Sequence, residues 1–263
     1  MDTFQHIVLS PHYDDAALSC GGLIAQLGAA GQPVVVATLF GGKPDYDNLS
    51  PFARQIHGRP LAGADPIDQR RAEEAAALAI LAAQSRTGDW LDCIYRQDAG
   101  QSRWLYTDEA ALFGAVDRAD DELIEELAHC LASLAPAPAA CALIAPLAIG
   151  HHVDHQIVRR SATLLHEHGY QVWFYEDYPY IARDRAGLAA SLGEPGRWQA
   201  RSVPLNPAAV QRKIEAVLAY PSQLEVLFPG QGPLEPRVSV ALHGQAEATG
   251  QGQLAERLWR LRH

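Results

Sequence analysis

The chain has 263 residues, of which 48% are hydrophobic and 20% are charged, so global disorder is excluded. Its net charge of −10, with only two lysines and scattered arginines, disfavours nucleic acid and anionic membrane surfaces as partners. The long apolar run at residues 75–83 is far shorter than the roughly 20 residues of a membrane helix, so no membrane span is expected.

Two further features of the sequence indicate the compartment. The first residues, Met-Asp-Thr-Phe-Gln-His, contain neither the basic nor the apolar region of a signal peptide. Four cysteines without Cys-x-x-Cys spacing lie in apolar segments, namely Cys20, Cys93, Cys130 and Cys141. We therefore expect buried free thiols and a reducing, cytoplasmic location.

Along the first two-thirds of the chain, strand-like segments alternate with helix-like ones. Strands are expected at residues 6–10, 33–40, 90–96, 140–147 and 170–175, which are short apolar runs. Helices are expected from Asp14 or Asp15 to Leu27, and at residues 65–84, 120–134, 153–168 and 207–219. Residues 41–64 are predicted to form a long loop, and residues 244–253 a Gly/Gln-rich stretch before a short amphipathic end.

This alternation predicts a mostly parallel sheet that is covered by helices on both faces. Ligands of such sheets bind beyond the carboxyl ends of the strands, where the strand order reverses. In the common order 3-2-1-4-5, the reversal lies between the first and the fourth strand. The segments that follow these two strands are therefore the expected location of the chemistry.

Both of these segments are dense in residues that bind metals. The first is Ser-Pro-His-Tyr-Asp-Asp-Ala at residues 10–16, and the second is Gly-His-His-Val-Asp-His at residues 150–155. A catalytic zinc uses three protein ligands, so a His and an Asp from the first segment with a His from the second would suffice. Taken singly, an acid also fits a helix N-cap and a histidine pair fits a solvated loop. The paired placement favours a metal site, since two adjacent acids cannot both cap one helix.

The residues within these segments also match known signatures. Residues 12–16, His-Tyr-Asp-Asp-Ala, resemble the His-Pro-Asp-Asp-Glu signature of the LmbE-like, or PIG-L-like, N-deacetylases. Residues 152–155, His-Val-Asp-His, resemble the second signature of that family, His-x-Asp-His. Residues 70–73 are similar to its Arg-x-x-Glu helix, and residues 175–180 and 220–223 also look like family segments. Because the similarity covers most of the chain, it implies a single domain over residues 1–263.

The resemblance implies a Rossmann-like three-layer α/β/α fold with a mostly parallel sheet. It also implies a metal-dependent hydrolase that removes an N-acetyl, or other N-acyl, group from an N-acetylglucosamine-type sugar or glycoconjugate. The implied cofactor is Zn²⁺, or another divalent metal such as Fe²⁺. Its ligands would be His12, Asp15 and His155.

The resemblance assigns further residues to catalysis, and residue chemistry suggests candidates for substrate binding. Asp14 would be the general base, His152 would face the scissile carbonyl, and Asp154 would orient that histidine or another one. Sugar hydroxyls would be recognised by acids and arginines near the site. The candidates are Arg70, Asp92, Glu176 and Asp177.

Three positions depart from the family signatures. The proline of the first signature is Tyr13, its final glutamate is Ala16, and the proline of the second signature is Val153. Every inferred ligand and the inferred base are retained, so the chemistry is expected to be retained as well. Tyr13 is expected to pack in the interior rather than to face the pocket.

Other functions stay open at this point. The chain could be an amidase for another N-acyl substrate, such as a thiol-sugar conjugate or a glycosylated natural product, or a non-catalytic homologue that binds metal or sugar. A dinucleotide-dependent oxidoreductase is disfavoured, because no Gly-x-Gly-x-x-Gly follows the first strand. The expected partner is a small-molecule N-acyl sugar, with a homo-oligomer as an open alternative and no nucleic acid.

Overall fold

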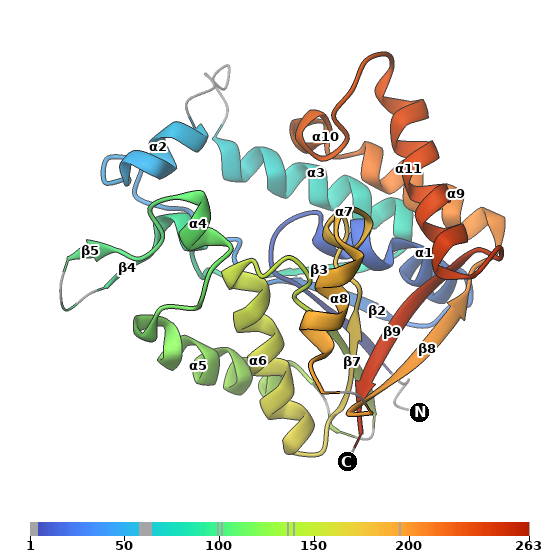
Figure 1. The fold of residues 1–263 in the computed structure, drawn as a ribbon, viewed down its shortest axis with the longest axis horizontal. Helices are drawn as coiled ribbons and strands as arrows, with labels where there is room; N and C mark the ends of the chain where they lie inside the picture. The colour runs from blue at the N-terminus through green and yellow to red at the C-terminus, as the bar shows by residue number, and fades with distance from the viewer. Residues whose placement is uncertain are drawn as a thin grey trace.

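The computed structural model describes residues 5–57, 65–98, 100, 102–135, 137–138, 140–194 and 196–262. Within these residues, a seven-stranded sheet forms the centre of the molecule (Figure 1). Its strands lie in the order β3 (Gln84–Thr87), β2 (Val34–Thr38), β1 (Gln5–Ser10), β6 (Cys141–Pro146), β7 (Gln171–Tyr175), β9 (Ala255–Leu261) and β8 (Trp198–Pro204). The first five strands pair in parallel, and β9 pairs antiparallel with both β7 and β8.

Helices cover both faces of the sheet, which confirms the predicted three-layer α/β/α fold (Figure 1). One layer contains α1 (Asp15–Ala29), α3 (Pro66–Leu81), α9 (Pro207–Leu218), α10 (Pro221–Leu227) and α11 (Leu234–Thr249). The other contains α5 (Asp121–Leu134), α6 (Val153–Glu167) and α8 (Arg185–Leu192), with α7 (Tyr180–Arg183) just before α8. Among the described residues, no helix combines the length and the apolar character needed to cross a membrane.

The central strands divide their side chains between the two layers. Val8 and Val36 pack in the core beneath α1 and α3, while Ile7 and Val35 pack in the core beneath α5 and α6. Successive strand side chains point to opposite faces, so a strand buried on both faces is apolar throughout. This is why short apolar runs predicted these strands. The four cysteines are free thiols, as expected, and only Cys130 is less than fully buried.

The order β3-β2-β1-β6-β7 is the predicted order 3-2-1-4-5. β1 and β6 are neighbours, with Ile7 opposite Leu143 and Val8 opposite Ile144. After β1 the chain turns toward β2, and after β6 it turns toward β7. The two connections therefore lead away from each other, in opposite directions along the sheet. This geometry places the two segments that are predicted to bind metal beside each other.

The third predicted strand, at residues 90–96, is wrong. The third strand is β3, whose four residues are exposed at the sheet edge and carry no apolar pattern. Residues 93–95 instead form the short helix η1 (Cys93–Tyr95). Their apolar side chains fill a separate small core with Ala53 and Tyr106, so their hydrophobicity reflects burial outside the sheet.

Residues 41–57 are only partly the predicted loop, because they contain α2 (Pro51–His57); residues 58–64 lie outside the described residues. α2 packs on an extension formed by η1, the hairpin β4 (Gln97–Asp98)–β5 (Arg103–Trp104), α4 (Glu109–Leu112) and η2 (Arg118–Asp120). α3 has the predicted Asp65 cap, which accepts the N–H groups of Ile67 and Asp68. It ends at Leu81 rather than at residue 84, because Ala82 is left-handed with φ 56°.

The C-terminal region is more regular than the sequence indicates. The predicted Gly/Gln-rich stretch lies largely within α11, which buries Val238, Leu242 and Ala246 at helical spacing. The short amphipathic end is β9, which enters the sheet between β7 and β8. β8 is mostly exposed, so it too lacks the apolar run of a buried strand.

Candidate active site

The segments that follow β1 and β6 meet around a cavity of about 190 Å³. Side chains from α1, α3, α7 and α10 complete its walls. The residues that line it are His12, Asp14, Asp15, Leu18, Arg70, Asp92, His152, His155, Pro179, Tyr180 and Leu227. The volume is below the roughly 300–1,000 Å³ of sites that enclose a drug-sized ligand, so the cavity suits the reacting end of a larger substrate.

Three side chains that the sequence predicts as metal ligands converge in this cavity. The Oδ2 atom of Asp15 lies 3.2 Å from Nδ1 of His12 and 3.3 Å from Nε2 of His155. Ring nitrogens of His12, His152 and His155 also lie within 4.8 Å of one another. Imidazole nitrogens with a carboxylate oxygen are donors that suit zinc and ferrous iron. The residues therefore fit the divalent metal that the sequence implies.

A buried carboxylate contacts His12, and another contacts His155, each on the side of the ring that faces away from Asp15. Nε2 of His12 lies 2.9 Å from Oδ2 of Asp154, and Nδ1 of His155 lies 2.7 Å from Oδ1 of Asp177. Both carboxylates are fully buried. If a metal bound here, such a partner would fix the ring and keep a proton on the far nitrogen, while the metal would replace the proton on the near nitrogen. The side chain of Asp154 therefore orients His12 rather than His152.

The charges around the site favour ionised carboxylates. Burial opposes the ionisation of Asp15, but His155 and His12 outweigh it and hold the pKa of Asp15 well below its usual range. Burial likewise opposes the ionisation of Asp154, but Arg96 and His12 hold its pKa low. Arg96 places Nη1 2.7 Å from Oδ1 of Asp154. Both carboxylates are therefore anionic near neutral pH.

Asp14 stands at the entrance of α1 in a strained conformation. Its φ of 96° lies in the left-handed region, which costs a residue other than glycine about 1–3 kcal/mol. Its Oδ1 atom lies 3.4 Å from Nη2 of Arg70. Burial raises the pKa of Asp14 to about 7, because Arg70 offsets this effect only in part and Asp15 adds to it. A cavity-lining carboxylate with this pKa suits proton exchange with a substrate.

His152 forms the N-cap of α6. Its Nδ1 atom accepts a hydrogen bond from the backbone N–H of Asp154 at 3.3 Å. A neutral ring that accepts at Nδ1 carries its proton on Nε2. Burial and the nearby His12 lower the pKa of His152 well below its usual value, so the ring is neutral. His152 therefore lines the cavity as a neutral N–H donor.

The turn between β6 and α6 delivers His152 to the cavity. Ala148, Gly150 and His151 all have positive φ, at 58°, 89° and 62°. A Cβ atom at Gly150 would lie 2.4 Å from the ring of Tyr180. The close approach therefore requires glycine at position 150, and the positive φ also favours glycine there.

Two of the four predicted substrate-binding residues, Arg70 and Asp92, line the cavity. Nη2 of Arg70 donates to the backbone oxygen of Tyr13 at 2.9 Å, in addition to its contact with Asp14. Asp92 accepts from the backbone N–H of Ile94 at 3.2 Å. Both side chains are only partly enclosed and can meet a substrate.

The other two predicted substrate-binding residues, Glu176 and Asp177, do not line the cavity. Asp177 is occupied by His155 and by the backbone N–H of Ile149, which donates at 3.0 Å. Glu176 accepts from Nη1 of Arg257 and Nε1 of Trp259, at 3.2 and 3.0 Å. Adjacent residues at a strand end point in opposite directions, so of the two only Asp177 contacts His155, on the side that faces away from the cavity.

The structure shows how two of the three departures from the family signatures, Tyr13 and Ala16, are accommodated. Tyr13 is buried, as predicted, and its hydroxyl donates to the backbone oxygen of Gly41 at 3.1 Å. Ser10 supports the loop that carries Ala16 in place of glutamate. Its hydroxyl donates to the oxygen of His12 at 2.7 Å and accepts from the N–H of Ala16 at 3.0 Å.

Sequence reasoning missed two charged residues that hold the site from behind. Arg96 bridges Asp154 to Asp120, whose Oδ2 atom lies 3.0 Å from Nη2 of Arg96. Glu74 accepts from the backbone N–H of Asp14 at 3.3 Å. Arg96 lies close to Asp92 along the chain, and this position could have indicated that it belongs to the site. Glu74, by contrast, looks like any charged residue on a helix.

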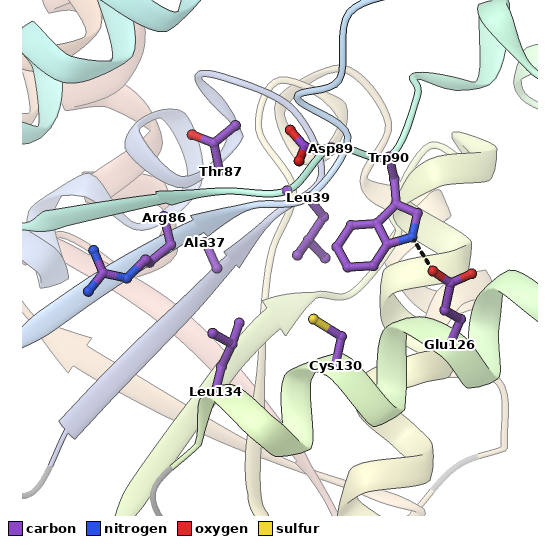
Figure 2. A pocket seen from close by; sticks show the side chains of 10 residues that line it. Ala37, Leu39, Arg86, Thr87, Asp89, Trp90, Glu126, Cys130 and Leu134 are labelled. Atoms are coloured by element: carbon purple, nitrogen blue, oxygen red, sulfur yellow. Dashed lines mark hydrogen bonds between the residues drawn. The ribbon is translucent and has the colours of Figure 1, made fainter.

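A larger hollow, of about 460 Å³, lies between the β2–β3 edge of the sheet and α5 (Figure 2). Ala37 and Leu39 form part of its lining, and Leu134 faces it from α5. Trp90 borders it and donates from Nε1 to Oε1 of Glu126 at 3.0 Å. None of the signature residues lines this hollow, so the smaller cavity carries the candidate chemistry.

Comparison with known proteins agrees with this site. The family model for PIG-L, GlcNAc-PI de-N-acetylase, matches residues 7–165, which is more than half of the chain and includes both signatures. The chain belongs to the PIG-L family. The resemblance drawn from the two signatures is thereby confirmed for this PIG-L family member.

Similar proteins match nearly the whole chain. 2'-N-acetylparomamine deacetylase of Niallia circulans is 29% identical over 86% of this chain and 83% of its own length. The enzyme of the same name from Streptomyces fradiae is 31% identical over 83% of this chain and 73% of its own length. Among solved structures, the zinc-inhibited form of teicoplanin deacetylase Orf2 has a TM-score of 0.80 at 30% identity over 97% of both chains. The A40926 pseudoaglycone deacetylase Dbv21 has a TM-score of 0.76 at 26% identity, over 99% of this chain and 98% of its own chain.

Proposed function

We propose that this protein is a metal-dependent N-deacetylase that removes the acetyl group from an N-acetylglucosamine-type sugar within a glycosylated small molecule. The observation that carries the proposal is the convergence of His12, Asp15 and His155 beside Asp14 in one cavity. The small cavity supports a substrate whose sugar enters while its aglycone stays outside. The names of the paromamine and teicoplanin relatives support a glycosylated natural product as that substrate.

His12, Asp15 and His155 would hold the metal, with Zn²⁺ as the first candidate and Fe²⁺ as the second. A bound divalent ion supplies Lewis acidity toward the amide carbonyl and lowers the pKa of water toward ~7. Asp154 and Asp177 keep the two imidazole rings oriented for this task.

Asp14 is the proposed general base, and Arg70 restrains its Oδ1 atom. The Asp14 carboxylate accepts a proton from the attacking water as the water oxygen bonds to the acetamide carbon. The carbon–nitrogen bond then breaks, and Asp14 returns the proton to the leaving amine nitrogen. The products are the free amino sugar and acetic acid, which ionises to acetate by releasing its proton to solvent, and Asp14 ends in its starting state.

His152 is the proposed donor to the developing oxyanion. The proton on its Nε2 atom can bond to the carbonyl oxygen as that oxygen gains charge, without any prior protonation of the ring. One well-placed donor of this kind contributes about 3–4 kcal/mol to transition-state stabilisation. His152→Ala should therefore lower kcat by two to three orders of magnitude, about 10²–10³-fold, with metal retained.

The proposal is tested by measuring amine release from a panel of N-acetylglucosaminides, with and without a chelator. The panel contains free N-acetylglucosamine, its disaccharide, an inositol-linked form, an N-acetylated aminoglycoside and an N-acetylglucosaminyl glycopeptide. Release that a chelator abolishes and added metal restores is expected for at least one glycoconjugate. No release by chain shown to carry one metal ion would contradict the proposal and favour a binding role.

Two variants test the assigned roles. Asp14→Ala should abolish turnover while the metal stays bound, because Asp14 touches the substrate side of the site and not the ligand set. His155→Ala should lose both turnover and metal. Near-native turnover in Asp14→Ala would contradict the assignment of Asp14 as the base.

A further inference from the structure

One face of α3 holds both ends of the peptide group between Tyr13 and Asp14. Nη2 of Arg70 donates to the oxygen of Tyr13 at 2.9 Å, and Oε2 of Glu74 accepts from the N–H of Asp14 at 3.3 Å. Arg70 and Glu74 are one helical turn apart, so their side chains are neighbours on α3. Together they set the orientation of this single peptide plane.

That orientation matters because Asp14 has a φ of 96°. A residue with a Cβ atom stays in this region only when its surroundings hold it there. Relaxation to negative φ would turn the peptide plane and carry the N–H away from Glu74. The carboxylate of Asp14 would then leave its place in the cavity.

Glu74 is itself held in place from several elements. Its side chain is buried, and its Oε1 atom accepts from the hydroxyl of Thr38 at 2.9 Å. The hydroxyl of Tyr220, just before α10, donates to Oε2. Glu74 therefore ties the signature loop to the end of β2 and to the start of α10. It does not line the cavity.

We propose that Glu74 is a positioning residue that acts through the backbone N–H of Asp14 and holds the Asp14 carboxylate where it can exchange a proton with substrate. This inference rests on the proposed function, since the task exists only if Asp14 is the base. Glu74 touches neither the substrate cavity nor the three proposed metal ligands, so its loss should lower kcat without changing metal content.

The neighbouring Glu73 provides a matched control. It is also buried on α3 and also accepts from three donors: the hydroxyl and the backbone N–H of Ser222, at 2.6 and 3.2 Å, and Nε2 of Gln69 at 3.1 Å. A structural role alone predicts similar effects from both residues. A positioning role predicts that only Glu74 affects turnover.

The experiment measures kcat, KM, bound metal and Tm of full-length Glu74→Leu, Glu74→Gln and Glu73→Leu with the best substrate of the panel. Glu74→Leu should lose about 10–100-fold in kcat, at unchanged KM and metal content. Glu74→Gln should stay within about threefold of wild type, because its amide oxygen can still accept from Asp14 while its NH₂ group meets the Thr38 hydroxyl. Glu73→Leu should lower Tm and leave kcat within about threefold.

Several results would overturn the inference. These are a folded Glu74→Leu with kcat within about twofold of wild type, equal kcat losses in Glu74→Leu and Glu73→Leu, or a Gln variant as impaired as the Leu variant. If Glu74→Leu does not fold, Tyr220→Phe replaces it and should lower kcat about threefold at constant KM; unchanged kcat would overturn the inference. If the wild-type protein releases no amine from any panel member, the proposed function is overturned as well. If the wild type and Glu74→Leu are both active and Asp14→Ala is inactive, only this inference is overturned.

Discussion

The ring of His155 lies between two carboxylates, Asp15 on the cavity side and Asp177 on the buried side. Burial disfavours the charged ring, but Asp15 and Asp177 outweigh it and raise the pKa of His155 to about 9. Asp177 also accepts the N–H of Ile149, so its two oxygens have fixed and different partners. At the scale of one residue, the orientation of the His155 ring therefore depends on a carboxylate that lies outside the cavity.

Asp177→Asn should weaken metal binding about 10–100-fold, because the amide NH₂ group must face one of two N–H donors. The measurement is the metal content of purified protein across a series of buffered Zn²⁺ concentrations. Glu176→Gln is the control, since the carboxylate of Glu176 is next to Asp177 in the chain but accepts from Arg257 and Trp259 outside the cavity. Equal Zn²⁺ affinity in Asp177→Asn and wild type would refute the orienting role.

At the scale of elements, the β6–α6 turn depends on glycine. Gly150→Ala should destabilise the protein by about 1–3 kcal/mol and lower kcat, because the new methyl group meets Tyr180 and displaces His152. Gly244→Ala is the control: Gly244 lies inside α11 with open space around it, so alanine should stabilise the helix by up to about 1 kcal/mol. Urea unfolding and turnover of both variants check this. An active, stable Gly150→Ala would show that the turn relaxes freely.

α1 also depends on a contact between elements. Its backbone is non-helical at Cys20, and the N–H groups of Gly22 and Leu23 just beyond donate to Glu256 of β9 at 3.0 and 2.8 Å. Nζ of Lys213 on α9 lies 2.8 Å from the same carboxylate. This buried pair thus connects α1, α9 and β9.

Glu256→Leu should cost about 3–5 kcal/mol of unfolding free energy, because it leaves the buried Lys213 charge without a partner. The double variant Glu256→Leu/Lys213→Met removes that charge and should recover part of the loss. Chemical denaturation of the three proteins measures the difference. A double variant less stable than Glu256→Leu alone would contradict this account of the pair.

At the scale of the whole molecule, the proposed metal joins segments about 140 residues apart. Binding to the folded state alone stabilises by about 2.7 kcal/mol at a metal concentration 100-fold above Kd. For a chain of this size, Tm should rise by about 5–10 °C. Thermal unfolding with Zn²⁺ and with a chelator measures this shift. His155→Ala should show almost none of it; a shift of equal size in that variant would place the metal elsewhere.

The agreement between sequence and structure also follows from the whole fold. β1, β2, β6 and β7 were predictable because strands in the middle of a parallel sheet are apolar on both faces. β3 and β8 lie at the two edges and are mostly exposed, so their sequences carry no such pattern. The apolar residues 93–95 look like part of a strand in the sequence because burial in a small separate core produces the same local composition.

The sequence by itself determined which chemical groups would meet. His12, Asp14 and Asp15 directly follow one central strand and His155 follows its neighbour, so the strand order alone brings them together. Only the tertiary structure decided which residues hold those groups from behind. Glu74 and Arg96 contact elements distant in sequence, and Glu176 lies outside the cavity because its strand end turns it toward β9. Local sequence carries the pattern of an element, whereas the partner of a buried side chain depends on how the elements pack.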